Sequence, residues 1–175
     1  MTVIAGIRQS LTWNGVDAAL FAAAAVKPAD RVLDVGCGTG ATTRIAARLA
    51  SRGHAVGVDI SAPLLRTAQK LTAAEKIANA SYQVADAQVH PFPACGYDVI
   101  VSRGGVLSLA DPAAACRNLA RALMPGGRLV LVSSRSDPDR VRAVLDGWEN
   151  VEVVRHEGIR LVTAGRPRRM PTDAG

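Results

Sequence analysis

The sequence predicts an α/β fold in which helices cover both faces of a mostly parallel sheet. Short apolar runs rich in β-branched residues alternate along the chain with longer segments of helical composition, as in successive βαβ units. A glycine-rich turn follows the first apolar run directly, and acidic residues end or follow successive runs. At 175 residues and 18.2 kDa, the chain fits a single domain with a real core.

The glycine turn follows the apolar run Val32 to Val35, which we interpret as a buried strand. Gly36, Gly38 and Gly40 allow the left-handed backbone angles that a strand-to-helix turn of this length requires. The N–H groups at the start of the next helix are then free to face a ligand. The spacing is G-x-G-x-G and not the G-x-G-x-x-G of dinucleotide sites, and Asp34 adds a carboxylate, which favours a cationic ligand over a pyrophosphate.

The other elements follow in order from the same patterns of apolar periodicity, caps and breakers. We expect helices over residues 16–26, 41–51, 62–74, 112–123 and 137–148. We expect strands over 54–59, 80–84, 97–102 and 128–132, and a hairpin of strands over 151–155 and 159–163.

Several of these segments resemble one known family. Asp34 to Gly40 closely resembles the first motif of class I S-adenosylmethionine-dependent methyltransferases, whose loop wraps the methionine half of the cofactor. Gly57 to Ser61 resembles the second motif, in which an acid binds the ribose. Asp86 and Ala87 match the acid and the backbone N–H that meet the adenine, and Met124 to Val132 resembles the Pro-Gly-Gly turn and fifth strand.

The resemblance covers residues 16–165 and implies a Rossmann-like three-layer α/β/α sandwich. Its seven-stranded sheet is mostly parallel, in the order 3-2-1-4-5-7-6, with an antiparallel C-terminal hairpin strand. Residues 1–15 are expected to form an N-terminal arm, and 166–175 a disordered basic tail. The implied cofactor is S-adenosyl-L-methionine, with S-adenosyl-L-homocysteine as product. The implied cofactor-binding residues are Asp34, Gly36, Cys37, Gly38, Thr39, Gly40, Asp59, Ile60, Asp86, Ala87, Ser102 and Arg103.

The implied reaction is in-line transfer of a methyl group to a small-molecule acceptor, as in the group that includes ubiquinone and menaquinone methylases. A corrin-ring methyltransferase of the precorrin type, an RNA methyltransferase and a non-catalytic cofactor-binding subunit stay open as alternatives. No general base can be named from the sequence. His90 and Arg103 lie on the expected acceptor side, but for each a structural role is the more common one.

Charge and composition restrict the partners. The formal net charge is +6, and Arg44, Arg48 and Arg52 recur at the spacing of one helix face. Aromatic residues make up only 3% of the chain, and no basic run is interleaved with stacking side chains, so a nucleic-acid partner is not expected. The site could be closed by the N-terminal arm, through Trp13, or by a second subunit over the strand ends, and we favour the arm acting within a homodimer.

Metal binding and membrane insertion are not expected either. The three cysteines, Cys37, Cys95 and Cys116, are far apart, and no second cysteine or histidine lies at zinc-ligand spacing. No apolar run is long enough to cross a bilayer, and the N-terminus lacks the pattern of a signal peptide. We therefore expect a cytoplasmic protein without a metal ion.

Overall fold

The computed structural model of the chain describes residues 15–133, 137–156 and 158–167. The predicted N-terminal arm, with Trp13, and most of the predicted tail lie outside the described residues, so the predicted domain limits stay predictions. Arg166 is a described residue of the tail segment, and its Nε donates to the Ala120 carbonyl oxygen at 3.2 Å. No helix within the described ranges is long and apolar enough to cross a membrane.

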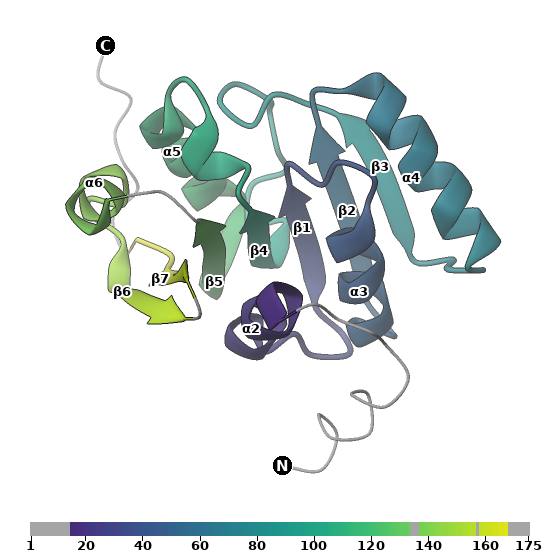
Figure 1. Cartoon of the computed structure of the whole chain (residues 1–175), viewed down its shortest axis with the longest axis horizontal. Coiled ribbons are helices and arrows are strands. Elements are labelled where there is room, and N and C mark those ends of the chain that lie inside the picture. The colour runs from purple at the N-terminus through teal and green to yellow at the C-terminus, as the bar shows by residue number, and fades with distance from the viewer. Residues whose placement is uncertain (1–14, 134–136, 157, 168–175) are drawn as a thin grey trace.

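A single seven-stranded sheet forms the middle layer of the molecule (Figure 1). Its strand order, β3-β2-β1-β4-β5-β7-β6, confirms the predicted one. The first five strands are parallel, and β7 runs antiparallel to both β5 and β6. The strands are β1 (Arg31–Val35), β2 (His54–Asp59), β3 (Ala80–Val84), β4 (Tyr97–Arg103), β5 (Leu123–Ser133), β6 (Glu149–His156) and β7 (Ile159–Gly165).

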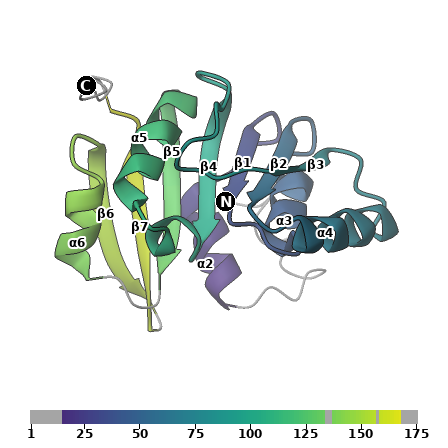
Figure 2. The same cartoon turned by 90° about the horizontal axis from the view of Figure 1, so that it is seen from above.

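Helices flank the sheet, and Figure 2 shows this arrangement from above. They are α2 (Gly15–Ala24), α3 (Ala41–Leu49), α4 (Ala62–Ala74), α5 (Pro112–Ala122) and α6 (Pro138–Val144), with the 3-10 turn η1 (Val106–Ser108). The central strands are buried on both faces, so neighbouring residues of one strand belong to different cores. Val32 packs in the core that includes residues of α2 and α3, whereas Leu33 packs in the core that includes residues of α5 and α6.

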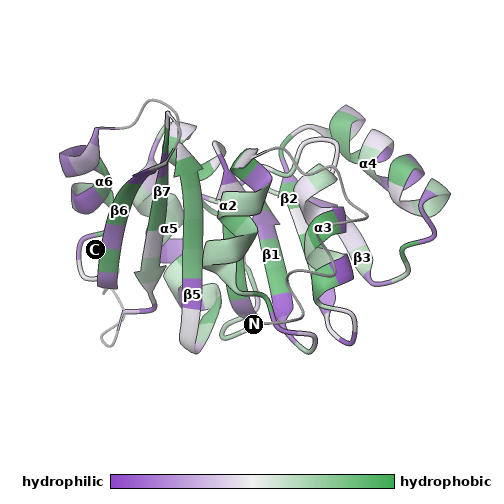
Figure 3. Ribbon diagram, turned by 60° about the horizontal axis from the view of Figure 1, so that its bottom comes forward, coloured by the Kyte–Doolittle hydropathy of each residue, from purple (hydrophilic) through white to green (hydrophobic). Residues whose placement is uncertain are grey.

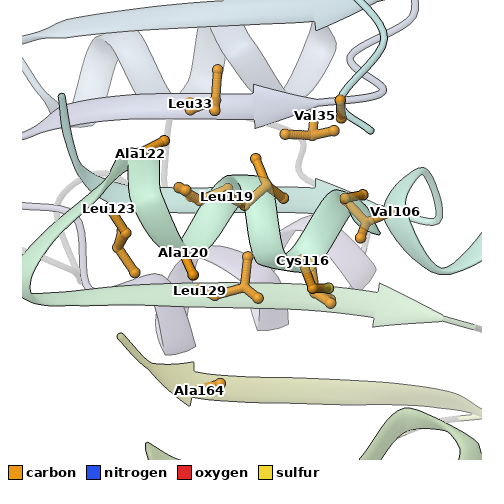
Figure 4. Packing of buried hydrophobic residues seen from close by; sticks show 14 of the residues in the cluster. Leu33, Val35, Val106, Cys116, Leu119, Ala120, Ala122, Leu123, Leu129 and Ala164 are labelled. Carbon is orange, nitrogen blue, oxygen red and sulfur yellow. The ribbon is translucent and has the colours of Figure 1, made fainter. Parts of the chain in front are cut away.

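The core on the α5 side contains the larger cluster of buried side chains. Figure 4 shows Leu119 of α5 packed among strand residues that include Leu33 and Leu129. Figure 3 shows β5 as hydrophobic along most of its length, which fits a strand in the interior of the sheet. This packing fixes the carboxyl ends of β1, β2 and β4 at one edge, where open α/β sheets bind ligands.

Helix α6 is shorter than the sequence predicts. It ends at Val144, whereas the expected helix runs to Trp148. Gly147 adopts a left-handed φ of 80° and Asn150 a φ of 50°, so the chain leaves the helix and enters β6. Trp148 is buried in the α5-side core, and this packing replaces the last helical turn.

The fifth strand is longer than predicted because it contains the expected turn. Tyr97 pairs with Leu123, but Val99 already pairs with Arg128, so the intervening segment bulges out of the ladder. Gly126 in this segment has a φ of 75°. The prediction of a turn before Arg128 is therefore confirmed, although the strand resumes on both sides of it.

Candidate functional site

The glycine turn is attached to the end of the neighbouring strand. Gly36, Gly38 and Gly40 have φ values of 72°, 54° and 77°, all in the left-handed region. The N–H groups of Gly36 and Cys37 both donate to the carbonyl oxygen of Val58, at 2.8 and 3.1 Å. The turn therefore leaves β1 and passes directly over the carboxyl end of β2.

Asp59, the last residue of β2, fixes the middle of this turn. One carboxylate oxygen, Oδ2, accepts a hydrogen bond from the Gly38 N–H at 2.9 Å. The other, Oδ1, accepts from the Ser61 N–H at 2.9 Å, and the Ser61 hydroxyl accepts from the Leu64 N–H at the start of α4. Because each carboxylate oxygen has two lone pairs, both can still accept a hydrogen bond from a ligand hydroxyl.

A pocket of about 250 Å³ lies beside this carboxylate, at the carboxyl ends of β1 and β2. It is lined by Val35, Gly36, Val58, Asp59, Ile60, Ala85, Ala87, Gly105, Ser108 and Leu109. Most of these side chains are apolar, and Asp59 is the charged one among them. Ile60 is 70% exposed, so its side chain is available to cover a flat ligand group.

The pocket contains some of the predicted site residues and adds others. Gly36, Asp59, Ile60 and Ala87 line it. Sequence reasoning did not select Val35 of β1 or Val58 of β2, because apolar residues at strand ends look like ordinary core positions. The paired glycines after β4 were a usable signal for Gly105, since a Cβ there would lie 2.8 Å from the Val35 carbonyl oxygen.

Asp34 lies in β1, one residue before its end, and is buried, with 1% of its surface exposed. Its Oδ2 accepts hydrogen bonds from the hydroxyls of Thr42 and Thr43, both at 2.6 Å. Its Oδ1 is buried and has no hydrogen-bond partner among the described residues. Burial raises the pKa of Asp34 from 3.8 to about 6, although the two threonine hydrogen bonds act to lower it.

Cys37, Thr39 and Gly40 shape the turn from within. Cys37 is buried, and this burial raises the pKa of its thiol to about 12, so the sulfur is inert at neutral pH. The Thr39 carbonyl oxygen accepts from Arg44 Nη1 at 2.8 Å. A methyl group at Gly40 would collide with the Tyr82 ring. These three predicted site residues therefore contact other parts of the protein. Contact between their backbone and a cofactor stays a prediction.

Ser102 and Arg103 hold the end of β4 in place. The buried Ser102 hydroxyl donates to the Val35 carbonyl oxygen at 2.7 Å and accepts from the Val106 N–H at 3.1 Å. Arg103 Nη1 forms an ion pair of 2.8 Å with Asp17 of α2. Neither residue lines the pocket. Sequence reasoning missed Asp17, because a lone acid in the first turn of a helix looks like an ordinary dipole partner.

Asp86 lies in the loop after β3, next to Ala87. Its carboxylate accepts from the Gln88 N–H at 2.9 Å and from Gln88 Nε2 at 3.0 and 3.1 Å. These hydrogen bonds hold the pKa of Asp86 below its usual value, so the group is ionised at neutral pH. Asp86 is outside the pocket lining, whereas Ala87 is in it.

Two arginines of the predicted stripe on α3 form ion pairs within the fold. Arg44 and Arg48 of the arginine stripe both pair with Glu75 of the segment after α4, at 2.9 and 2.7 Å. Part of the stripe is therefore neutralised within the fold. Within the described ranges, no group of three histidine, cysteine or acidic residues could hold a metal ion.

The strand order, the glycine turn after β1 and the acid at the end of β2 together define the class I methyltransferase fold. A family model described as a methyltransferase domain matches residues 32–127. The chain therefore belongs to the methyltransferase domain family.

The sequence is also similar to those of known methyltransferases. The chain is 36% identical over 126 residues to the ubiquinone/menaquinone biosynthesis C-methyltransferase of Shewanella frigidimarina, a match that covers 70% of this chain and 50% of that protein. This chain spans about half the length of the curated relatives it matches.

Two solved structures share the fold. A putative methyltransferase from Bacillus halodurans is 18% identical with a TM-score of 0.76, covering 88% of this chain and all of that one (100%). Phosphoethanolamine N-methyltransferase 2 of Haemonchus contortus, solved in complex with S-adenosyl-L-methionine, is 19% identical with a TM-score of 0.78, covering 89% of this chain and 53% of that one.

Proposed function

We propose that this chain binds S-adenosyl-L-methionine and transfers its methyl group to a small-molecule acceptor. The observation that carries the proposal is the left-handed glycine turn that Asp59 holds beside an apolar pocket. The cofactor-bound structure of the Haemonchus contortus enzyme, which has the same fold, supports this choice of ligand. The identity to the C-methyltransferase of Shewanella frigidimarina favours a small-molecule acceptor.

The residues present fit the chemistry of this cofactor. The unpartnered Oδ1 of Asp34 is a buried acceptor that suits an ammonium group, which the methionine half of the cofactor carries. Asp59 has free lone pairs for two ribose hydroxyls, and charge-assisted hydrogen bonds of this kind are strong. The apolar pocket wall, with Ile60 at its exposed rim, suits the adenine base.

The cofactor, when bound, supplies a methyl group on a sulfonium, which is already a good leaving group. The protein therefore has to orient the two reactants and exclude water. Gly105 contributes to this, because its lack of a side chain lets the loop after β4 lie against Gly36. The Arg103–Asp17 ion pair anchors the start of α2 to the end of β4, at the point where the strand order reverses.

The other interpretations receive less support. RNA binding through the arginine stripe is weakened by the pairing of Arg44 and Arg48 with Glu75. The corrin-ring and non-catalytic alternatives have no observation in their favour over a small-molecule methyltransferase. Homodimer formation stays a proposal, to be tested by the mass of the particle in solution.

Calorimetry tests the proposal. The chain is titrated with S-adenosylhomocysteine, with S-adenosylmethionine and with NAD, and we expect saturable binding of the first two only. A release assay then follows S-adenosylhomocysteine formation across phenols, quinones, tetrapyrroles, amines and RNA. Binding of NAD without a response to S-adenosylhomocysteine would overturn the cofactor assignment, and turnover on RNA alone would overturn the acceptor class.

A further inference from the structure

The loop after β3 presents one peptide group to the pocket in a fixed orientation. The carbonyl oxygen of Asp86 accepts from the N–H groups of Val89 and His90, at 3.1 and 2.8 Å. The C=O and N–H of a trans peptide point in opposite directions, so the N–H of Ala87 points away from this turn. Within the described part of the chain it donates to no acceptor, and Ala87 is a pocket residue.

Asn118 of α5 holds the same loop from behind. Its side-chain amide is buried, and Nδ2 donates to the Ala87 carbonyl oxygen at 3.0 Å and to the His90 carbonyl oxygen at 2.7 Å. The two hydrogens of the amide group thus bind two carbonyl oxygens, one near each end of the turn. Removal of this amide would leave two carbonyl oxygens in need of partners and free the turn to shift.

Gln88 fixes the neighbouring carboxylate in a similar way. Its Nε2 donates to both oxygens of Asp86, and its Oε1 accepts from the N–H of Asp111 at 2.7 Å. Asp111 is the N-cap of α5, where its side chain accepts from the Ala114 N–H. The start of α5 therefore orients the Asp86 carboxylate, and the middle of α5 orients the Ala87 peptide.

We propose that Asn118 and Gln88 are positioning residues that make this site selective for an adenine base. Together they present an N–H donor at Ala87 next to a carboxylate acceptor at Asp86. Adenine offers the complementary pair, a ring-nitrogen acceptor beside an amino donor, whereas hypoxanthine has an N–H and a carbonyl oxygen there. This inference rests on the proposed function, since the base it concerns is that of S-adenosylmethionine.

The test compares the dissociation constants of S-adenosylhomocysteine and S-inosylhomocysteine. The wild-type chain should prefer the adenine compound by about tenfold or more, as expected for a mismatched donor and acceptor. Asn118→Ala should reduce this preference by about fivefold, because the donor at Ala87 is no longer held in place. Gln88→Ala should also reduce the preference, and it carries the test if Asn118→Ala does not fold.

Asn79 provides a matched control. Its Nδ2 donates to the carbonyl oxygens of Ala47 and Ala50, both at 2.8 Å. Asn79 directly precedes β3, so it lies at the amino ends of the parallel strands, away from the pocket. Asn79→Ala should lower the melting temperature and leave the base preference unchanged. This control separates a loss of stability from a loss of positioning.

The outcomes distinguish this inference from the proposed function. If the wild-type chain binds S-adenosylhomocysteine but Asn118→Ala and Gln88→Ala keep its base preference, the positioning role is wrong and the proposed function stands. The same conclusion follows if both variants weaken the two ligands equally. If the wild-type chain binds neither compound, both proposals are overturned.

Discussion

The Asp59 carboxylate and the Gly38 backbone are joined by a hydrogen bond of 2.9 Å. One side chain at the end of β2 therefore shapes the glycine turn after β1 and also faces the pocket. This double use explains why an acid suits this position better than an amide. A carboxylate accepts from every direction, whereas an amide would turn a donor toward one of its present partners.

Asp59→Asn should lower the affinity for S-adenosylhomocysteine by about 1.5–3 kcal/mol, on the order of 10- to 150-fold. The amide nitrogen would face either the Gly38 N–H or the Ser61 N–H, and the charge that strengthens hydrogen bonds to the ribose would be lost. Calorimetry measures the change.

Asp98→Asn is the matched control for this variant. Asp98 also accepts from a backbone N–H, that of Arg31, at 2.8 Å, but it lies near the beginnings of β1 and β4, at the other edge of the sheet. Its replacement should leave the ligand affinity unchanged. If the two variants bind S-adenosylhomocysteine as tightly as the wild-type chain, Asp59 has no role in the ligand site.

Gly105→Ala should damage the pocket through a steric clash. The new methyl group would lie 2.8 Å from the Val35 carbonyl oxygen and 3.1 Å from the Gly36 Cα, both backbone atoms that cannot rotate away. We expect a loss of about 1–3 kcal/mol in the free energy of unfolding. Binding of S-adenosylhomocysteine should weaken as well, and denaturant melts with calorimetry measure the two effects.

Gly158→Ala serves as the comparison for Gly105→Ala. Gly158 has a φ of 85° with open space around its Cα, and it lies in the turn between β6 and β7. Alanine there should cost about 1 kcal/mol of stability through its backbone conformation alone, without an effect on ligand affinity. Wild-type affinity in Gly105→Ala would show that the loop after β4 does not border the ligand.

The buried Asp34 predicts an unusual pH dependence of stability. Its pKa is about 6 in the folded chain and 3.8 as the reference value, so the folded state binds the proton more tightly between these pH values. The ionised carboxylate therefore destabilises the fold above pH 6, and this penalty disappears as the pH falls toward 4.

The Asp34→Asn variant carries a side chain that is neutral at every pH, so comparison with it should show how much the ionised carboxylate destabilises the wild-type chain. Its free energy of unfolding relative to the wild-type chain should rise by up to about 3 kcal/mol between pH 4 and pH 7. Urea melts of both chains across this range provide the data. A difference that stays constant with pH would mean that Asp34 titrates near its ordinary value.

Much of the fold follows from local patterns in the sequence. The predicted helix over 62–74 and the strands over 54–59 and 80–84 have the observed limits. Ser61 caps the helix, and the apolar residues Val56 and Val58 mark the first of these strands. Helix α6 is shorter than predicted, because Trp148 fits a helical pattern but packs in the core after the left-handed Gly147. Tertiary packing outweighed the local pattern there.

The candidate site can be predicted from the sequence only at its glycines and at the acid that ends a strand. Glycines with left-handed angles and an acid at a strand end are visible in the sequence, and Gly36 and Asp59 indeed border the pocket. Asn118 was not visible, because its role depends on a helix far along the chain packing behind the loop after β3. Such long-range contacts leave no local signature.

An NMR titration of the backbone amides tests whether S-adenosylhomocysteine binds at the carboxyl ends of β1 to β3, as we propose. We expect saturable shifts for the amides of Gly36, Gly38, Ala87 and Gly105. The amides of Asn79 and Gly127, near the opposite ends of the strands, should not shift. Saturable shifts confined to other parts of the chain, or no shifts at millimolar ligand, would contradict the proposal.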